Sequence, residues 1–451
     1  MMKSINPYNQ QILATYQEFS DSKIQKAITL SAVTYTSWKT ATLVDRIRLI
    51  KKLSNNLRSQ KVKLAEMMTL EMGKIKKEAL AEVEKCAWLC DYYADNAHTL
   101  LAARHVKTEM YKSYVTYQPL GTVLAVMPWN FPFWQVFRAA VPALLAGNTM
   151  LLKHASNVFG CALLIEQLFL DSGFPKGAFI SLLIGSQKVE QVIKARSVVG
   201  VALTGSEMAG SAVASLAGKN IKRQVLELGG SDAFIVLEDA DLAKAADVAV
   251  ASRMLNAGQS CIASKRFFVE EKIQESFLDE VIKRLKKLKI DNPLSEKTNM
   301  GPMARMDLSD ELNEQLKKGL SQGAKVIQGG DRDQCLFEPT LLYLPSADNI
   351  LAQEETFGPL MPIVSFSTVQ EAIQMANHSR FGLGGSVWTQ DLEKGENVAL
   401  QIEAGAVFVN GMVRSDPRLP FGGIKDSGYG RELSQEGILE FVNTKTVVVE
   451  Q

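Results

Sequence analysis

The first hundred residues of the chain carry apolar residues three and four positions apart, which is the periodicity of amphipathic helices. Ser22 precedes the first of these patterns and has the chemistry of a helix N-cap. The next stretch changes period, because residues 109–118 are rich in Tyr, Val and Thr, which favour strands. The pattern predicts a strand over residues 109–118 and helices over residues 24–39, 44–60, 62–73 and 77–102.

From residue 121 onward, short apolar runs alternate with longer segments of helical periodicity. Strands separated by helices of about 10 to 15 residues predict a parallel, doubly wound sheet. Ligands of such sheets bind at the carboxyl ends of the strands. The predicted strands cover residues 122–127, 149–153, 180–184 and 198–203, and the predicted helices cover residues 133–145, 160–171, 187–196 and 206–217.

A second α/β pattern begins near Gly229, and a chain of 451 residues is too long for one simple core. The last segment, residues 441–449, is β-branched, and a strand of that kind must pair with something, for which another subunit is a natural partner. In this second part we expect helices over residues 242–255 and 273–288 and strands over residues 233–236, 267–269, 341–344, 361–366, 384–388 and 406–410.

Composition places the chain among ordinary globular proteins, with 46% apolar and 22% charged residues. A net charge of +1 gives no electrostatic footprint for nucleic acid, and no run approaches the roughly 20 apolar residues of a membrane span. Five irregularly spaced cysteines and an N-terminus without a signal-type apolar run favour a reducing, cytoplasmic location. Four scattered histidines predict no metal site.

The residue types needed for thiol-based acyl chemistry occur in three separate segments. Cys261 lies in a Gly-rich turn, where a thiolate could attack a carbonyl carbon. Glu227 lies between two leucines, and partial desolvation would raise its pKa and suit it to take a proton from the thiol or from water. Asn130 lies in a turn bracketed by prolines and is a candidate oxyanion donor. Taken alone, a single cysteine is more often a small buried hydrophobe.

A nucleotide site is suggested by strand ends rather than by a glycine fingerprint. No Gly-x-Gly-x-x-Gly follows the first strand of the parallel sheet. Thr204, Gly205 and Ser206 close a strand and open a helix, so the N–H groups there could meet a phosphate. Ser206 as a plain N-cap is the alternative. Lys153 follows another strand and supplies a cation.

Together these residues resemble the aldehyde dehydrogenase superfamily over nearly the whole chain. The segments that carry the resemblance are 128–132 (PWNFP), 203–206 (LTGS), 226–231 (LELGGS), 258–261 (GQSC), 354–359 (EETFGP) and 420–425 (PFGGIK). The resemblance implies an α/β fold with a Rossmann-like cofactor domain over residues 1–105 and 119–228. It also implies an α/β catalytic domain over residues 229–427 and oligomerisation strands over residues 106–118 and 428–451.

The resemblance also implies a role for each candidate residue. Cys261 would form a thiohemiacetal whose oxyanion rests on Asn130, and Glu227 would activate the water that hydrolyses the thioester. Release of a free acid is then favoured over transfer to coenzyme A. Lys153 would bind the adenine ribose, Ser206 the pyrophosphate and Glu355 the nicotinamide ribose. The full set of implied cofactor-binding residues is Trp129, Lys153, Ser156, Gly185, Thr204, Gly205, Ser206, Glu355 and Phe357.

Ser156 bears on the choice of cofactor. Members that prefer NAD often carry Glu three residues after the lysine, where this chain has Ser156. A hydroxyl leaves space and a donor for a 2′-phosphate, with Lys153 as countercharge. NADP is therefore the expected cofactor, with NAD also possible.

Three residues are candidates for binding the substrate. Trp134 and Arg138 lie one turn apart on the helix that lines the aldehyde entry in the family, and a cation there suits a distal carboxylate. Ser415 could hydrogen-bond the same carboxylate. Residues 414–420 and 428–433 resemble bacterial succinate-semialdehyde dehydrogenases. The alternatives are a structural salt bridge for Arg138 and an NAD-dependent enzyme for medium-chain or amino aldehydes. The resemblance further implies a homodimer or homotetramer with a small aldehyde as its partner molecule.

Overall fold

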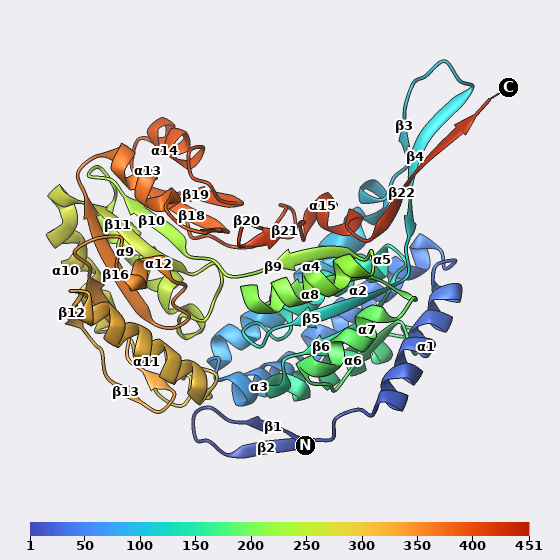
Figure 1. The fold of residues 1–451 in the computed structure, drawn as a ribbon, viewed down its shortest axis with the longest axis horizontal. Helices are drawn as coiled ribbons and strands as arrows, with labels where there is room; N and C mark the ends of the chain where they lie inside the picture. Colours follow the sequence, from blue (N-terminus) through green and yellow to red (C-terminus); the bar gives the residue numbers. More distant parts are fainter. Residues whose placement is uncertain (451) are drawn as a thin grey trace.

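The computed structural model describes residues 1–450 as two lobes and a projecting arm. The first lobe contains most of the first 227 residues, and the second lobe contains the segment that follows (Figure 1). A three-stranded sheet forms the arm, which carries the C-terminal end of the chain away from both lobes (Figure 1).

The sheet of the first lobe is parallel except at one edge and has the order β21-β9-β8-β5-β6-β7. Its strands are β5 (Thr122–Met127), β6 (Thr149–His154), β7 (Phe179–Ser181), β8 (Val198–Thr204), β9 (Arg223–Glu227) and the antiparallel β21 (Gly428–Tyr429).

Alternate residues of this sheet face two different layers of helices. Val123 and Ala125 belong to the core formed with helices α2 to α6, whereas Leu124 between them belongs to the core formed with α1, α7 and α8. This period of two with both faces covered is what a doubly wound sheet requires. The helices are α1 (Asp21–Trp38), α2 (Leu43–Ser59), α3 (Lys61–Met72), α4 (Lys76–Leu100), α5 (Trp134–Leu145), α6 (Phe159–Asp171), α7 (Val189–Lys194) and α8 (Glu207–Lys219).

The sheet of the second lobe has seven strands in the order β12-β15-β16-β11-β10-β18-β19, all parallel except β12. Its strands are β10 (Asp232–Val236), β11 (Ser264–Glu270), β12 (Lys325–Gln328), β15 (Thr340–Tyr343), β16 (Leu360–Phe366), β18 (Gly384–Trp388) and β19 (Ala406–Val409). Side chains of α9 (Leu242–Met254) and α10 (Gln274–Leu285) cover one face. The other face is covered by α11 (Met306–Ser321), α12 (Ile350–Gln353), α13 (Val369–Asn377) and α14 (Leu392–Ala399).

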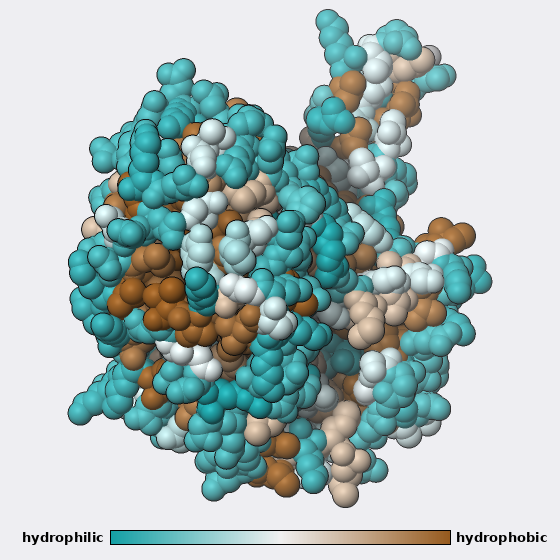
Figure 2. All heavy atoms as spheres, turned by 60° about the vertical axis from the view of Figure 1, so that its left-hand side comes forward, coloured by the Kyte–Doolittle hydropathy of each residue, from teal (hydrophilic) through white to brown (hydrophobic). Residues whose placement is uncertain are grey.

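The arm pairs β22 (Val442–Val449) with β4 (Lys112–Pro119) along their whole length, and β3 (Arg104–His105) adds a short third strand. Figure 2 shows the arm standing clear of the body, with hydrophilic and hydrophobic residues mixed along it. Tyr111 at its tip is 67% exposed and Val448 is 49% exposed. The arm thus presents apolar side chains and an open strand edge to solvent.

The structure corrects the sequence-based expectations in several places. The N-cap of α1 is Ser20, which accepts from the Lys23 N–H, and Ser22 lies within the helix. Within the segment 428–451, which we expect to serve oligomerisation, β21 joins the first sheet through β9 and α15 (Ser434–Leu439) packs on α5. Elements that the periodicity did not predict include the hairpin β1 (Met2–Ile5) and β2 (Ile12–Tyr16), strands β9 and β12 and helices α11 to α15.

The short elements complete the fold. They are the strands β13 (Arg332–Asp333), β14 (Leu336–Phe337), β17 (Phe381–Gly382) and β20 (Ile424–Lys425) and the 3-10 turns η1 (Ser156–Val158), η2 (Ser186–Lys188), η3 (Leu255–Gly258) and η4 (Glu271–Ile273). Among residues 1–450, none of the helices combines the length and the apolar character that crossing a membrane requires.

Candidate active site

The candidate residues gather at the carboxyl edge of the first sheet. Glu227 ends β9, Thr204 ends β8, and His154 ends β6, so the segments that follow all leave from the same edge. The loop with Trp129 and Asn130 follows β5 between them. His154 Nε2 donates to Pro132 O over 2.9 Å, and burial lowers the pKa of His154 to about 4, so the imidazole is neutral. It anchors this loop rather than offering a charge to a ligand.

Cys261 is presented by a strained turn. Asn256 and Ala257 adopt φ values of 54° and 53°, and Gly258 follows at 73°. A left-handed backbone is uncommon for residues with a side chain and clusters at functional sites. Position 258 also has no room for a side chain, because a Cβ added to Gly258 would lie 2.3 Å from Gly358 O. The turn, together with its contact to the 354–359 loop, fixes the position of the backbone that carries the Cys261 thiol.

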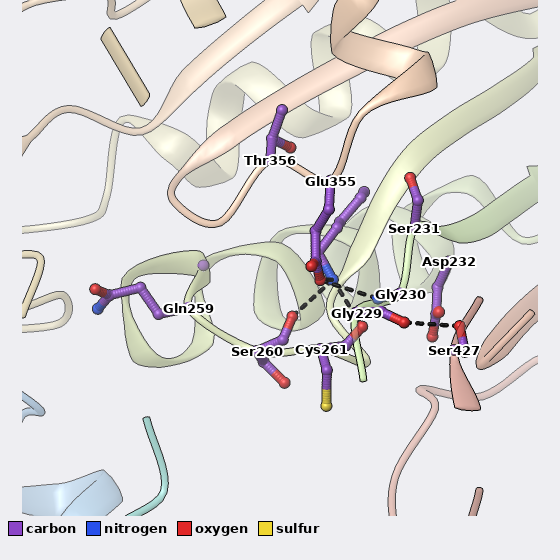
Figure 3. A network of polar contacts seen from close by, with 12 residues as sticks. Gly229, Gly230, Ser231, Asp232, Gln259, Ser260, Cys261, Glu355, Thr356 and Ser427 are labelled. Atoms are coloured by element: carbon purple, nitrogen blue, oxygen red, sulfur yellow. Dashed lines mark hydrogen bonds and ion pairs between the residues drawn. The ribbon is translucent and has the colours of Figure 1, made fainter. Parts of the chain in front are cut away.

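A buried lysine organises the backbone beneath the thiol. Lys265 Nζ donates to Ser260 O and Cys261 O, each over 2.7 Å, and pairs with Glu355 Oε1 at 3.2 Å. The same Glu355 oxygen accepts from the Gly230 N–H at 3.0 Å. Figure 3 shows that the Cys261 sulfur points away from this network. The network therefore holds the Cys261 backbone and leaves the thiol free to react.

The thiol of Cys261 is protonated at neutral pH. Burial raises its pKa to about 11, against the opposing effects of the Lys265 and Arg138 charges. Because the thiolate is the nucleophile, the site must remove this proton when the aldehyde reacts.

Asn130 is held in place by hydrogen bonds, and one hydrogen of its side-chain amide has no acceptor among the described residues. Its side-chain Nδ2 donates to Gln259 O at 3.1 Å, and its main-chain carbonyl accepts from Asn256 Nδ2 at 2.8 Å. The side chain is buried, and an amide NH₂ has two donors. Since Asn130 and Cys261 line the same cavity, the second hydrogen is available to an oxyanion formed there.

Glu227 is buried with both carboxylate oxygens unpartnered by hydrogen bonds within residues 1–450. Burial raises its pKa well above the ordinary range, which the Arg138 charge opposes. A Cβ on Gly422 would lie 2.7 Å from Glu227 Oε1, so only glycine leaves room for the carboxylate in this position. A buried carboxyl with a raised pKa and no hydrogen-bond partner has the properties of a group that takes up and releases a proton during catalysis.

A cavity of about 270 Å³ brings together most of the predicted cofactor residues with the nucleophile. Predicted residues in its lining are Trp129, Asn130, Thr204, Gly205, Ser206, Cys261, Glu355 and Phe357. Trp129 and Phe357 meet edge to face with 5.8 Å between ring centroids. Lys153, Ser156 and Gly185 are not part of the lining: Lys153 lies near the end of β6, Ser156 follows β6, and Gly185 follows β7.

Ser206 also caps α8, where its Oγ accepts from the Ala209 N–H at 3.3 Å, so the N-cap interpretation describes its contact in this structure. Gly229 is confined by Glu355, whose Oε2 would lie 2.6 Å from an added Cβ. The floor of the cavity is thus backbone and small residues, which allows a ligand close approach.

A second cavity, of about 210 Å³, reaches Cys261 from the other side. The three predicted substrate residues, Trp134, Arg138 and Ser415, all line it. Arg138 is buried, forms an ion pair with Glu432 and donates to Thr204 Oγ1 at 3.3 Å. The salt-bridge alternative for Arg138 is therefore realised in the structure, and its charge is balanced within the protein.

Sequence reasoning missed several residues of the site. Helix α11 supplies Leu308, Glu311, Leu312 and Gln315 to the first cavity, and α4 supplies Glu78, Glu82 and Lys85 to the second. Glu82 accepts from the Phe133 and Trp134 N–H groups, each at 2.9 Å, and so anchors the start of α5. The leucines at every fourth position of α11 could have predicted the helix, but not its place beside Cys261.

The raised thiol pKa predicts how alkylation of Cys261 depends on pH. The thiolate fraction grows about tenfold per pH unit below the pKa, so the rate constant for iodoacetamide should climb steadily from about pH 7 to about pH 10. Inactivation kinetics of the cofactor-free enzyme measure it, with Cys261→Ala as the background. A plateau already reached near pH 8 would contradict the burial argument.

The fold and the site define an enzyme that holds a thiol between two cavities at the edge of a doubly wound sheet. The chain belongs to the aldehyde dehydrogenase family, whose profile matches residues 1–447. The chain is 46% identical over 447 residues to a probable NADP⁺ succinate-semialdehyde dehydrogenase of Synechocystis, covering 98% of each chain. It is 43% identical to Sad, the NAD(P)⁺ succinate semialdehyde dehydrogenase of Escherichia coli, covering 98% of this chain and 97% of Sad.

Among solved structures, the succinic semialdehyde dehydrogenase of Streptococcus pyogenes, in complex with NADP⁺, superposes with a TM-score of 0.98. That chain is 38% identical to this one, and the match covers 100% of both. The aldehyde dehydrogenase fold expected from the sequence is thereby confirmed.

Proposed function

We propose that this protein oxidises succinate semialdehyde to succinate with NADP as the preferred cofactor, through a thioester on Cys261. The observation that carries the proposal is the position of Cys261 in the lining of both cavities. One cavity can hold the hydride acceptor and the other the aldehyde, so the reacting carbon would lie between them. The names of the relatives from Synechocystis, Escherichia coli and Streptococcus pyogenes support the substrate and the cofactor.

The first chemical step belongs to Cys261 and Asn130. The thiol gives up its proton, its sulfur bonds to the aldehyde carbon, and the carbonyl oxygen becomes an oxyanion. The free amide hydrogen of Asn130 and the Cys261 N–H would stabilise this charge. Lys265 keeps the Cys261 backbone fixed during the attack, because its ammonium binds the main-chain carbonyls of both Ser260 and Cys261.

The residues of the first cavity fit a nicotinamide cofactor. Gly229 and Gly205 leave room for close approach, Glu355 is partly exposed toward the cavity, and the Trp129–Phe357 pair offers an aromatic wall. When bound, the cofactor accepts the hydride that leaves the thiohemiacetal carbon. We propose that Glu355 holds the nicotinamide ribose, Ser206 the pyrophosphate, and Lys153, with Ser156 and Gly185 nearby, the adenosine end.

The second chemical step belongs to Glu227. Once the thioester has formed, Glu227 would take a proton from water, which attacks the acyl carbon, and the Cys261 thiolate leaves as the acid is released. The raised pKa of Glu227 suits this role, since a stronger base takes the proton more readily. The glycine at 422 leaves room for the Glu227 carboxylate in its buried position.

Ser156 should decide between the two nicotinamide cofactors. It is exposed at the start of η1, three residues after Lys153. Ser156→Glu should lower kcat/KM for NADP by roughly 10- to 100-fold, because a carboxylate repels the 2′-phosphate and competes for Lys153. The value for NAD should stay level or rise. Initial rates with each cofactor measure both, Ser156→Ala serves as the uncharged control, and an unchanged ratio would contradict this role.

Initial rates test the proposed function directly. The wild type should show a higher kcat/KM with succinate semialdehyde than with hexanal, and a higher one with NADP than with NAD. Equal rates on both aldehydes would favour the broader aldehyde dehydrogenase and remove the basis for naming the substrate.

We further propose that the protein is a homo-oligomer and lies in the cytoplasm. The arm supports the first point, because β22 has an open edge and exposed valines that another copy could cover. Five free cysteines support a reducing compartment. Sedimentation of wild type against a variant ending at residue 441 would test the role of the arm.

A further inference from the structure

Lys85 is a cation in a largely apolar cavity, and none of the described carboxylates lies within ion-pair distance of it. It extends from α4 into the cavity that reaches Cys261, and within residues 1–450 the structure records no ion pair for it. Burial, together with the neighbouring Arg138 charge, lowers its pKa to about 8. Keeping an ammonium in such a place costs free energy unless an anion joins it. The cavity is therefore built to receive a negative group.

The ammonium of Lys85 is held in one position by two neighbours. Its Nζ donates to Ser415 Oγ at 2.7 Å and lies 4.2 Å from the centre of the Trp134 ring. Ser415 is buried, and it comes from the segment after β19, across the cavity from α4. An ammonium has three donors, and these contacts use one N–H and one face of a ring. Further donors stay available to a ligand.

The other cations of this cavity are less suited to bind an anion. Arg138 already pairs with Glu432, and its guanidinium carbon lies 4.5 Å from the centre of the Phe421 ring. Arg414 is exposed, so water screens its charge. Lys85 thus combines partial burial, proximity to Ser415 and the absence of a recorded carboxylate partner.

We propose that Lys85, with Ser415 beside it, binds the distal carboxylate of a short semialdehyde whose aldehyde carbon lies at Cys261. This inference rests on the proposed function and names the group that selects the substrate. Arg138 then keeps its pair with Glu432 and serves as a wall of the cavity. The carboxylate would supply the ion-pair partner that the described residues do not give Lys85, and a neutral aldehyde would leave that lysine unpaired.

The test compares two aldehydes in the intact enzyme with NADP. Butanal has the carbon chain of succinate semialdehyde without its carboxylate, so the ratio of their kcat/KM values isolates carboxylate recognition. Lys85→Met should lower this ratio by about 100-fold, and Lys85→Arg should retain most of it. Lys77→Met is the matched control, because Lys77 lies on the same helix but outside this cavity, and its ratio should equal that of the wild type.

The dependence of this ratio on pH supplies a second readout that a structural role would not produce. Titration of Cys261 affects both aldehydes and cancels in the ratio. Lys85 loses its charge above about pH 8, so the wild-type ratio should fall as pH rises through that range. Lys85→Arg should remove this fall, since arginine stays charged. The titratable or charged groups that face Lys85 are Glu78, Glu82, Cys86, Arg138, Arg414 and Asp416.

Glu78 needs separate attention because burial raises its pKa to about 7. Its negative charge above that pH also disfavours a carboxylate, but this effect should persist in both Lys85 variants, whereas the fall near pH 8 should vanish. If the wild type prefers succinate semialdehyde and Lys85→Met has the same ratio of kcat/KM values as the wild type, the inference is overturned and the proposed function stands. A wild type without that preference overturns both. If Lys85→Met does not fold, the pH profile of Lys85→Arg decides.

Discussion

Replacing Cys261 with alanine should lower aldehyde oxidation by at least about 10⁴-fold, because no other group can form the covalent bond to the carbonyl carbon. The remaining thiols, Cys86, Cys90, Cys161 and Cys335, are buried and lie outside the linings of both site cavities. Initial rates of NADPH formation measure the loss. Binding of NADP, followed by quenching of tryptophan fluorescence, should change little, since the cofactor contacts proposed here do not include the sulfur.

The matched control is Cys335→Ala, which removes another thiol of the second lobe. Burial raises the pKa of Cys335 to about 11 as well, so the two thiols share their acidity and differ in place. Cys335→Ala should keep the wild-type rate. If activity survived in Cys261→Ala and disappeared in Cys335→Ala, Cys335 would be the nucleophile and the proposed mechanism would be overturned.

The sequence predicted the first sheet and the three chemical residues because their signals are local. The β5 boundaries, Thr122–Met127, match the prediction, since the strand is a continuous apolar run between a glycine and a proline. Asn130, Glu227 and Cys261 each lie within a short motif. The structure places the segment after β5 against the thiol turn, where Asn130 Nδ2 donates to Gln259 O, two residues before the thiol.

The partners that set the electrostatics of the site could not be predicted in the same way. Lys265 cannot be singled out from the sequence, because it has the appearance of an ordinary strand lysine and its partner Glu355 lies 90 positions later. Arg138 and Glu432 are separated still farther along the chain. Such ion pairs follow from how two lobes and a returning C-terminal segment meet, and no periodicity encodes that meeting.

Strand β9 illustrates the same limit for the fold. It has only five residues, begins with an exposed arginine and ends with a charged residue, so its pattern resembles a loop. It becomes a strand because β8 pairs with it on one side and β21 on the other. That pairing buries Glu227, and burial is what raises its pKa. The catalytic property of this glutamate therefore depends on a segment some 200 residues away.

Replacing Glu227 with glutamine should stop the enzyme after hydride transfer. The amide keeps the shape of the side chain but cannot take a proton from water, so hydrolysis of the thioester should slow by about 10² to 10⁴-fold. A rapid-mixing experiment should then show one NADPH per active site formed in a burst, followed by very slow turnover. Hydroxylamine, which attacks a thioester without a general base, should restore steady turnover.

The pH dependence and a control complete this test. Because burial raises the pKa of Glu227, the wild-type hydrolysis step should accelerate as pH rises through that pKa and the carboxylate forms, whereas Glu227→Gln should lack that acceleration. Glu403→Gln, which alters an exposed carboxylate paired with Lys425, should behave as the wild type. If Glu227→Gln shows no burst, Glu227 acts before hydride transfer, and its proton comes from the Cys261 thiol instead of from water.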